Sequence, residues 1–482
     1  MRVPLTRASR LQFLPVMVAV ILSAEPPLAA QDRKVIIVQT NAAADNISLI
    51  DAATNKVVGK VEGIEINHGA AAAPDGSRFY ISNEVDHSLD FVDARTLTII
   101  QKVSLSGRPN NVAIANDGRR VYVAIVSDPG AVDVIDTVSA KRVSSIKTVG
   151  GVHNTFMTPD GRYVVAGSIA GRNLTVIDAA SERALWTLSF DAGVRPMSFE
   201  TNPDGSTRRI FVQLSDFHGF AIVDFKERRE IRERIALPEI PERERHTEYL
   251  QGSPSHGQGV TPDGKMLWLC SKVNSHVYAY ALPDLNYVGG VRVGSHPDWL
   301  TFSPDSKYLY VANAGSNTTS VVDIARMTEV TQIPVGQVPK RVITARVPAA
   351  SVAAWRAVPQ SAPHASSRQP LDYEFFVAQV QPVFLKKREG HARCAACHST
   401  RATFRLQPPP PAGARWTAEQ SRLNFDAARS MVVAGDPLSS KLLRLPLAER
   451  AGGSPFHPGG KHWLDRSDSE WQTLASWVTG AR

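Results

Sequence analysis

Cysteine is scarce in this chain, which contains three cysteines among 482 residues. Three is too few for the disulfide scaffold of a small secreted protein. The chain also lacks a P-loop, a glycine-rich dinucleotide fingerprint and the nucleophile elbow of α/β-hydrolases, so none of these motifs marks its function. Hydrophobic residues make up 43% of the chain and charged residues 21%, which excludes a largely disordered protein.

Long apolar runs are absent after the first 30 residues. Residues 1–10 carry three arginines, residues 11–24 form an apolar stretch, and small residues follow up to Ala30. This order is typical of a secretory signal peptide that is cleaved near Ala30. The apolar stretch is shorter than the ~20 residues of a membrane span, although an uncleaved anchor stays the alternative. We therefore predict that residues 1–30 are a signal peptide, that the mature chain has no transmembrane span, and that the protein is periplasmic.

The formal net charge of +8 is unevenly spread, because basic residues exceed acidic ones mainly near the C-terminus. Residues 371–482 contain 15 Lys or Arg and 10 Asp or Glu, whereas residues 31–348 are nearly neutral. A basic region attracts acidic partners, so we expect a redox or other partner with an acidic docking face. We expect no nucleic-acid partner, because the chain is predicted to be exported and carries no nucleic-acid motif.

A repeat fills the middle of the chain. Turn signals of the form Pro-Asp-Gly recur with spacings of 42, 43, 44, 59 and 42 residues, and their aspartates are Asp75, Asp117, Asp160, Asp204, Asp263 and Asp305. A second marker, two apolar residues followed by aspartate, runs in phase at Asp51, Asp93, Asp136, Asp178, Asp224 and Asp323. The runs of Val, Ile, Tyr and Phe between these turns predict short antiparallel strands. Four strands at this period make a propeller blade.

The repeat predicts seven blades. Six blades start near residues 64, 107, 150, 191, 250 and 294. The seventh is split, since residues 33–63 supply most of it and residues 338–347 supply the missing strand. Pairing the two ends in this way removes the open edge of the ring. The repeats resemble YVTN-type β-propellers over residues 33–348, on phrases such as TVID, VYVAI and YLYVAN. That resemblance implies the fold, but such propellers host many unrelated activities.

The spacing of 59 indicates an insertion of about 15 residues within 226–255, a charged segment that contains prolines. An insertion in a repeat protein projects from one face, often the binding face. A solvated surface loop without a binding role is the alternative.

Histidine recurs at one phase of the repeat, six residues before the turn proline or its equivalent. That position is occupied, in blade order, by His68, Asn110, His153, Met197, His256 and Asp298. Arg108, Arg195 and His296 stand two residues earlier, and Lys340 with Arg341 stand near the equivalent place in the closing strand. The resemblance implies that this segment enters the innermost strand at the mouth of the central channel. Converging histidines can hold a second metal at the propeller axis or act as bases beside cationic anchors for an anionic substrate. Alternatively, they only bond to neighbouring backbone or water.

The composition changes at residue 349. Residues 349–370 are rich in Ala, Ser and Pro and have no acidic residue, which predicts a linker. After it, Phe376, Val380 and Phe384 form one apolar helical stripe. A second stripe, made of Trp471, Leu474 and Val478, follows a capping-box signature that starts at Ser467. Cys270 lies in a predicted blade strand, where a buried and inert thiol is expected.

The motif Cys394-Ala-Ala-Cys397-His398 lies between the two stripes. It fits C-x-x-C-H, the attachment signal of c-type haem, in which two cysteines bind the porphyrin and the histidine binds the iron. A thioredoxin-like dithiol would need a βαβ setting, and no strand pattern surrounds the motif. A structural zinc site would need a fourth ligand and usually a second cysteine pair. We therefore predict one covalent haem c.

Residues 371–482 resemble a cytochrome c domain on this motif and its flanking helices. The resemblance implies that Cys394 and Cys397 carry the haem and that His398 is the proximal iron ligand. Many related domains place a distal methionine before the last helix, but here that loop contains no methionine and offers His457 and then His462. The single methionine of the domain, Met431, lies in a predicted helix. We predict His457 as the distal ligand and His462 as the second choice, with an open sixth position as the alternative.

The sequence thus predicts a multidomain chain, an all-β seven-bladed propeller at 31–348, a linker at 349–370 and a small all-α cytochrome c fold at 371–482. The first hypothesis is a periplasmic electron-transfer protein whose propeller binds a small-molecule or protein ligand. Its stronger form is an oxidoreductase that uses the haem as an electron relay, with channel-mouth candidates His68, His153, His256, His296, Arg108 and Arg195. The alternative is a non-enzymatic binding or scaffold protein with a redox-active haem. A lactonase-like hydrolase would leave the haem without a role.

Overall fold

Apart from Met1, the computed structural model describes residues 32–357 and 371–480, with gaps at 43, 45, 65, 85, 245–252, 337, 389–392, 400–403, 412–413, 454–456 and 458–460. The predicted signal peptide and its cleavage position lie outside the described residues. No helix in the described part of the chain has the length and apolar character needed to cross a membrane.

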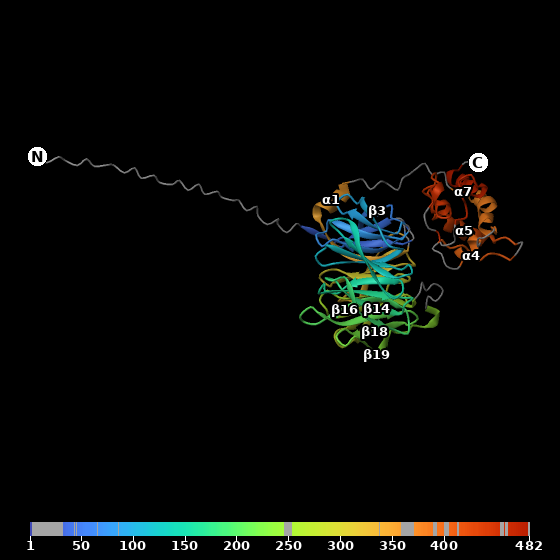
Figure 1. The fold of residues 1–482 in the computed structure, drawn as a ribbon. Helices are drawn as coiled ribbons and strands as arrows, with labels where there is room; N and C mark the ends of the chain where they lie inside the picture. The colour runs from blue at the N-terminus through green and yellow to red at the C-terminus, as the bar shows by residue number, and fades with distance from the viewer. Residues whose placement is uncertain are drawn as a thin grey trace.

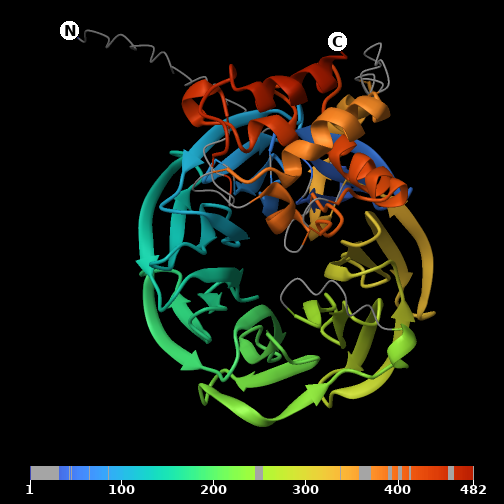
Figure 2. The ribbon, with the colours of Figure 1, turned by 90° about the vertical axis from the view of Figure 1, so that its right-hand side faces the viewer.

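Seven four-stranded antiparallel sheets form a closed ring, as the repeat predicts (Figure 2). The first strand of each sheet contacts the first strands of the two neighbouring sheets, so these seven strands surround the axis. Each sheet therefore runs outwards from the axis as one propeller blade. The seven sheets, from the innermost strand outwards, are β28 (Pro339–Pro348), β1 (Arg33–Asn41), β2 (Asn46–Asp51), β3 (Lys56–Glu62); β4 (Asn67–Ala72), β5 (Arg78–Asn83), β6 (Ser88–Asp93), β7 (Ile99–Ser104); β8 (Pro109–Ile114), β9 (Arg120–Ile125), β10 (Ala131–Asp136), β11 (Lys141–Lys147); β12 (Val152–Met157), β13 (Tyr163–Ser168), β14 (Asn173–Asp178), β15 (Arg183–Ser189); β16 (Val194–Thr201), β17 (Thr207–Leu214), β18 (Gly219–Asp224), β19 (Arg229–Ala236); β20 (Ser255–Val260), β21 (Met266–Ser271), β22 (His276–Ala281), β23 (Asn286–Arg292); β24 (Pro297–Phe302), β25 (Tyr308–Asn313), β26 (Thr318–Asp323) and β27 (Thr328–Pro334).

The split blade closes the ring as predicted. Strand β28 pairs antiparallel with β1, from Arg33 opposite Pro348 to Asn41 opposite Pro339. The two ends of the propeller sequence therefore share one sheet, and the ring has no open edge at its seam.

The repeated aspartates are explained by the turns they build. Asp75 Oδ1 accepts a hydrogen bond from the Ser77 N–H at 2.9 Å, and the aspartate of each equivalent turn accepts from the N–H two residues later. Gly76 has φ of +72°, and a Cβ there would lie 2.1 Å from the Arg346 carbonyl oxygen, so the turn needs glycine. The second set of aspartates caps the turns between third and fourth strands by accepting from the N–H two or three residues later.

The first part of the predicted linker differs from the prediction. Residues Ala349–Ala357 form helix α1, which follows β28 directly and packs against β1, β3 and β28 (Figure 1). Trp355 is 5% exposed, and its Nε1–H donates to the Ala94 carbonyl oxygen at 2.9 Å. Helix α1 therefore belongs to the propeller, while residues 358–370 lie outside the described part.

The C-terminal region contains helices with a hydrophobic core of their own. The predicted stripes are confirmed, since Phe376, Val380 and Leu474 are fully buried and Phe384, Trp471 and Val478 are at most 5% exposed. The elements are α2 (Tyr373–Phe375), the π-helical turn η2 (Phe376–Val380), α3 (Gln381–Leu385), α4 (Cys394–His398), α5 (Ala418–Arg429), α6 (Lys441–Arg444), the 3₁₀ turn η3 (Glu449–Ala451) and α7 (Ser469–Thr479); a further 3₁₀ turn, η1 (Glu242–Glu244), lies in the propeller insertion.

The predicted cap of the last helix was wrong by one residue. Asp468, not Ser467, precedes α7, and its carboxylate accepts from the N–H groups of Glu470 and Trp471. Ser467 bonds to Asp465 instead. Aspartate at the N-cap satisfies two open donors and also suits the positive end of the helix dipole.

Candidate functional site

The innermost strands carry an irregularity at one place in every blade. In each sheet the pairing register shifts beside the residue that stands six positions before the turn proline or its equivalent. Such β-bulges bend a strand and re-aim its side chains, and they are common beside active sites. In ring order from the closing strand, the residues at this position are Lys340, His68, Asn110, His153, Met197, His256 and Asp298.

The structure brings the three predicted histidines together. The ring centroids of His68 and His153 are 6.3 Å apart, and those of His153 and His256 are also 6.3 Å apart. Their strands, β4, β12 and β20, are separated from each other by intervening blades. Contact between such strands is only feasible across the axis, so the histidines form one cluster at the centre of the ring.

His68 is held by an ion-pair network. Its Nδ1 lies 3.0 Å from Glu84 Oε1, and Arg108 Nη1 lies 3.0 Å from Glu84 Oε2. Burial raises the pKa of Glu84, but the hydrogen bond and charge of His68 and the charge of Arg108 outweigh burial, so the net shift is downward. Glu84 is therefore a buried carboxylate that fixes both a histidine and an arginine.

His153 and His256 are neutral at pH 7. Burial lowers the pKa of each imidazole well below its usual value, and the positive charge of Arg195 adds to this effect at both rings. The Asn154 amide donates to His153 Nδ1 at 2.7 Å, whereas His256 Nδ1–H donates to the Asp298 carbonyl oxygen at 3.0 Å. Neutral imidazoles can accept a proton or donate an N–H bond to a ligand.

Asp298 joins two lysines beside His256. Its Oδ1 is 2.5 Å from Lys272 Nζ and 3.2 Å from Lys340 Nζ, and all three side chains are at most 10% exposed. Burial alone would raise the pKa of Asp298, but the two lysines hold it well below its usual value. Burial lowers the pKa of Lys272 to about 8, so this lysine is mostly protonated at pH 7. Asp298 is therefore a buried carboxylate that two lysines share.

Arg341 adds a further cation next to the same cluster. Its guanidinium carbon lies 4.0 Å from the ring centroid of Trp299 and 5.4 Å from that of Phe156, and Trp299 contacts His256 at 5.4 Å. Burial lowers the pKa of Arg341 to about 9. Its buried Nε and Nη1 have no hydrogen-bond partner among the described residues.

Two unsatisfied donors are costly for a buried cation. Two such donors cost about 2–6 kcal/mol, whereas two cation–π contacts return about 1–4 kcal/mol. At the middle of each range the aromatic contacts offset only part of the cost of the missing hydrogen bonds. The guanidinium is suited to an acceptor that the described protein groups do not supply.

The remaining predicted residues lie close to these networks. Arg195 Nε donates to Ser215 Oγ at 2.8 Å, and burial lowers the pKa of Arg195. His296 precedes β24 in a left-handed conformation with φ of +51°, and its Nδ1 lies 3.0 Å from Ser295 Oγ. In the described part of the propeller and the helices, no group of three or more His, Cys, Asp or Glu is placed to hold a metal ion.

Sequence reasoning missed Glu84, Lys272 and Ser215, although a signal for them exists. Each directly follows the second strand of its blade, which ends at Asn83, Ser271 and Leu214 respectively. Comparing this phase across the repeat would have found them. Trp299 was also missed, because one aromatic residue beside the repeated position carries no periodic signal.

The second site lies at the C-x-x-C-H motif, which forms helix α4. Cys394 begins the helix and His398 ends it. His398 Nδ1–H donates to the Phe404 carbonyl oxygen at 2.9 Å, which leaves Nε2 as the lone-pair nitrogen. A histidine that binds a metal usually donates its other ring N–H in this way. The side chain of Cys397 lies outside the described part of the structure.

His457 lies opposite His398. Their ring centroids are 6.2 Å apart, and the ring planes differ by 17°. A metal ion held between two imidazole nitrogens at about 2.0–2.1 Å would separate the centroids by about 6 Å. His462 lies next to His457, with ring centroids 6.0 Å apart. His398 and His457 are therefore at the separation that two imidazoles would have if both held one metal ion.

The thiol of Cys394 is not set up as a reactive nucleophile. Burial raises its pKa, and the nearby charge of Arg388 only partly offsets this rise. Arg388 Nη1 lies 3.8 Å from Cys394 Sγ and also pairs with Glu470. Redox-active cysteines in dithiol motifs usually show the opposite shift.

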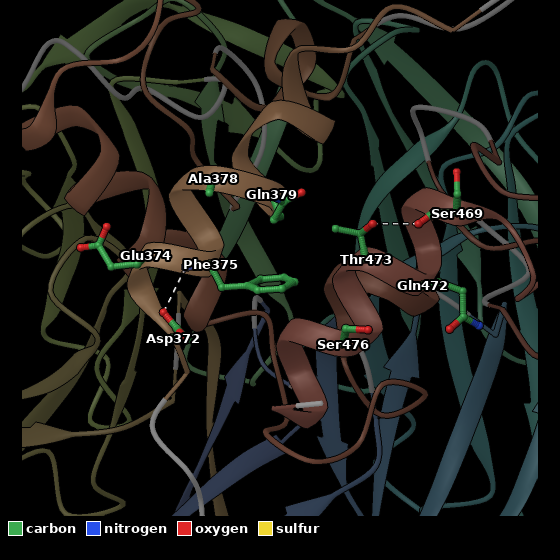
Figure 3. Close-up of a pocket in the computed structure, with 9 residues that line it drawn as sticks. All are labelled: Asp372, Glu374, Phe375, Ala378, Gln379, Ser469, Gln472, Thr473 and Ser476. Carbon is green, nitrogen blue, oxygen red and sulfur yellow. Dashed lines mark hydrogen bonds between the residues drawn. The ribbon is translucent and has the colours of Figure 1, made fainter. Parts of the chain in front are cut away.

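A shallow pocket lies where the first helical segment of this region meets α7 (Figure 3). Asp372, Phe375 and Gln379 line one side, and Gln472 and Thr473 line the other. The carboxylate of Asp372 caps α2 by accepting from the Phe375 N–H at 3.0 Å. None of the predicted site residues lines this pocket.

The chain matches no protein-family model and no curated protein. Among solved structures it is similar to hydrazine synthase of Kuenenia stuttgartiensis, with 23% identity over 60% of this chain and 92% of that chain and a TM-score of 0.51. It is also similar to the periplasmic gluconolactonase PpgL of Pseudomonas aeruginosa, with 18% identity over 66% and 99% and a TM-score of 0.52. A predicted 6-phosphogluconolactonase of Bacteroides uniformis gives 19% identity over 65% and 100% and a TM-score of 0.54. These likenesses show the fold, a seven-bladed β-propeller.

Proposed function

We propose that this protein is an exported c-type haem protein that transfers electrons, with the propeller as a platform for a substrate or partner. The observation that carries the proposal is the C-x-x-C-H motif on α4, with His398 and His457 at the separation that two axial ligands require. The predicted signal peptide supports the periplasm as its location, where c-type haem proteins can be assembled.

In this proposal each residue of the second site has one role. Cys394 and Cys397 bind the porphyrin through thioether bonds, His398 is the proximal ligand and His457 the distal ligand, with His462 as the second choice. The bond from His398 to the Phe404 carbonyl oxygen fixes the ring so that Nε2 can bind the iron. The haem supplies the uptake and release of single electrons, and two histidine ligands favour a lower potential than histidine with methionine.

The competing uses of two nearby cysteines have less support. The raised pKa of Cys394 disfavours a dithiol oxidoreductase. The region from 371 to 480 is helical in its described part and shows isolated bridges rather than a sheet. A cytochrome c domain agrees with these features and with the two buried helical stripes.

Basic residues flank the motif and support an acidic redox partner. Lys386, Lys387, Arg393 and Arg405 are exposed and lie within a few residues of α4 or of Phe404, which contacts His398. Rim charges of this kind mainly speed the encounter with a partner of opposite charge.

The propeller has two candidate roles within the proposal. An oxidoreductase would bind its substrate at the axis, where neutral His153 and His256 stand beside Arg195 and Lys340. A scaffold protein would instead use the propeller to bind a partner without chemistry. The lactonase-like neighbours do not decide between them, because a fold alone does not imply an activity.

A ligand-exchange experiment tests the haem site. His457→Met should replace one imidazole by a thioether and produce the near-infrared charge-transfer band of histidine–methionine ligation. His462→Met is the matched variant, and it should leave the spectrum unchanged. A band in the His462 variant alone would assign His462 as the ligand, and no change in either would refute histidine as the sixth ligand.

A redox screen of the holoprotein separates the two propeller roles. If the protein is an oxidoreductase, at least one small molecule should reduce or reoxidise the haem of the wild type. The same molecule should not react with the haem of a His153→Gln variant whose haem spectrum is intact. Reaction with artificial donors only, together with equal rates in the variant, would favour the scaffold role.

A further inference from the structure

The centre of the propeller gathers several basic side chains. Lys272 and Lys340 are buried, and Arg195 and Arg341 are half-buried. The carboxylates beside them are Asp298, which both lysines share, and Glu84, which pairs with His68 and Arg108. The charges of Arg195 and Lys340 both act on His153, which places them around the same ring. An excess of buried cations is stable only if anions or hydrogen-bond acceptors offset it.

Arg341 shows where such an acceptor is missing. Its buried Nε and Nη1 have no partner in the described part of the chain, although the guanidinium is fixed against Trp299 at 4.0 Å. A planar guanidinium held in one orientation presents its N–H donors at fixed angles, which suits a carboxylate or a similar oxyanion. Trp299 and Phe156 form the apolar wall beside it, with ring centroids 6.4 Å apart and planes 13° apart.

The histidines complete this arrangement. Trp299 contacts His256, and His256 contacts His153, so the donors of Arg341 and the imidazoles form one continuous cluster. Because Asn154 donates to its Nδ1, neutral His153 carries its proton on Nε2 and can donate that N–H to an oxygen atom without the cost of burying another charge. The cluster therefore offers a cationic donor at Arg341, a neutral donor at His153 and an apolar wall.

We propose that the centre of the propeller binds a small oxyanion, either an organic carboxylate or an inorganic oxyanion, with Arg341 as its principal anchor. Arg195 and Lys340 supply the surrounding positive field, and Trp299 holds the guanidinium in place. The inference rests on the ligand-binding role proposed for the propeller and does not depend on the haem. It names the chemical class of ligand that this site takes.

Calorimetric titration of the holoprotein tests the proposal, with acetate, malonate and inorganic phosphate as probes at constant ionic strength. Acetamide is the neutral control, because it has the shape of acetate without its charge. Binding of acetate or malonate but not phosphate would support a carboxylate site, and the reverse would support an inorganic oxyanion. Binding of none, or equal binding of acetate and acetamide, would overturn the proposal.

Three variants locate the bound anion. Arg341→Gln should weaken binding at least tenfold. Arg341→Lys should weaken it less, since lysine keeps the positive charge but lacks the paired N–H donors of the guanidinium. Arg346→Gln is the matched control, because Arg346 is exposed on the same strand β28, and binding should be unchanged. Wild-type affinity in the Arg341→Gln variant would refute Arg341 as the anchor.

Thermal melting and the haem spectrum of the same samples keep the outcomes separate. A variant that melts like wild type but no longer binds has lost the anchor rather than the fold. Anion binding in a protein without covalent haem would refute the haem proposal alone, and an intact haem without anion binding would refute the anion site alone.

Discussion

Replacement of Asp298 by asparagine should strongly destabilise the propeller. The Asp298 carboxylate is 1% exposed and lies 2.5 Å from Lys272 Nζ and 3.2 Å from Lys340 Nζ. Asparagine keeps the size of the side chain but removes the charge, so two buried lysines lose the carboxylate that they share. Breaking a buried ion pair on one side typically costs about 3–5 kcal/mol. We expect a loss of this size in the free energy of unfolding of Asp298→Asn at pH 7.

The loss should depend on pH in a defined direction. In the wild type the pKa of Lys272 falls from its ordinary 10.5 to about 8, so the unfolded chain binds one more proton than the folded chain between these values. Stability then rises with pH across that window, by about 3 kcal/mol for a shift of this size. Without Asp298, Lys272 loses its proton at lower pH. The difference in the free energy of unfolding between wild type and Asp298→Asn should therefore shrink as the pH rises toward about 8.

At acidic pH the stability difference between wild type and Asp298→Asn should disappear, because Asp298 itself becomes protonated. The pKa of Asp298 is well below its usual value, so its stabilisation is present above the usual aspartate range and is lost as the pH falls through the folded-state pKa. Wild type and Asp298→Asn should therefore converge in acid.

Urea unfolding followed by tryptophan fluorescence measures these differences. Asp305→Asn is the matched control, because Asp305 lies in the same blade and pairs with Lys307 at 3.3 Å, but both side chains are more than half exposed. Exposed pairs contribute at most about 1 kcal/mol. If Asp298→Asn were no more destabilising than Asp305→Asn, or its deficit grew toward pH 8, the buried charge network would not exist as described. Lys272→Met added to Asp298→Asn should recover part of the loss.

Two further predictions concern the helical region. Asp468→Ala should destabilise α7 by about 0.5–2 kcal/mol because it removes the N-cap, while Ser467→Ala should change stability by at most about 0.5 kcal/mol, as measured by helical circular dichroism on heating; equal effects would contradict the cap assignment. Reversing the charges of Lys387 and Arg405 to glutamate should slow haem reduction by an acidic donor about tenfold at low salt and by much less at high salt, whereas Lys56→Glu on the propeller should not; a salt-independent effect would argue against electrostatic docking.

The propeller could be predicted from the sequence because its turns repeat. The aspartates at positions such as Asp75 and Asp51 make local hydrogen bonds within their own turns. Their spacing along the sequence therefore predicts where the turns of each blade lie. The closing strand was also predictable, since residues 338–347 have the strand pattern without a blade of their own. The two helical stripes were found for the same reason, because periodicity is a local signal.

The networks at the axis could not be predicted in the same way. Asp298, Lys272 and Lys340 come from different blades, and their pairing depends on how neighbouring blades pack rather than on spacing. The recurrence of histidine at one position of the repeat indicated which side chains meet. It did not indicate that burial would keep His153 and His256 neutral. Helix α1 was missed because its Ala-rich sequence has little amphipathic pattern, and its position depends on packing against β1, β3 and β28 and on the hydrogen bond from Trp355 to Ala94.

The proposed covalent haem at Cys394, Cys397 and His398 is tested most directly by the intact mass of the denatured protein, after expression in a host that assembles c-type haem. Wild type should carry the added mass of one haem, and the double variant Cys394→Ala, Cys397→Ala should carry none. Absence of this mass from the wild type, or its persistence in the double variant, would rule out covalent haem attachment at this motif.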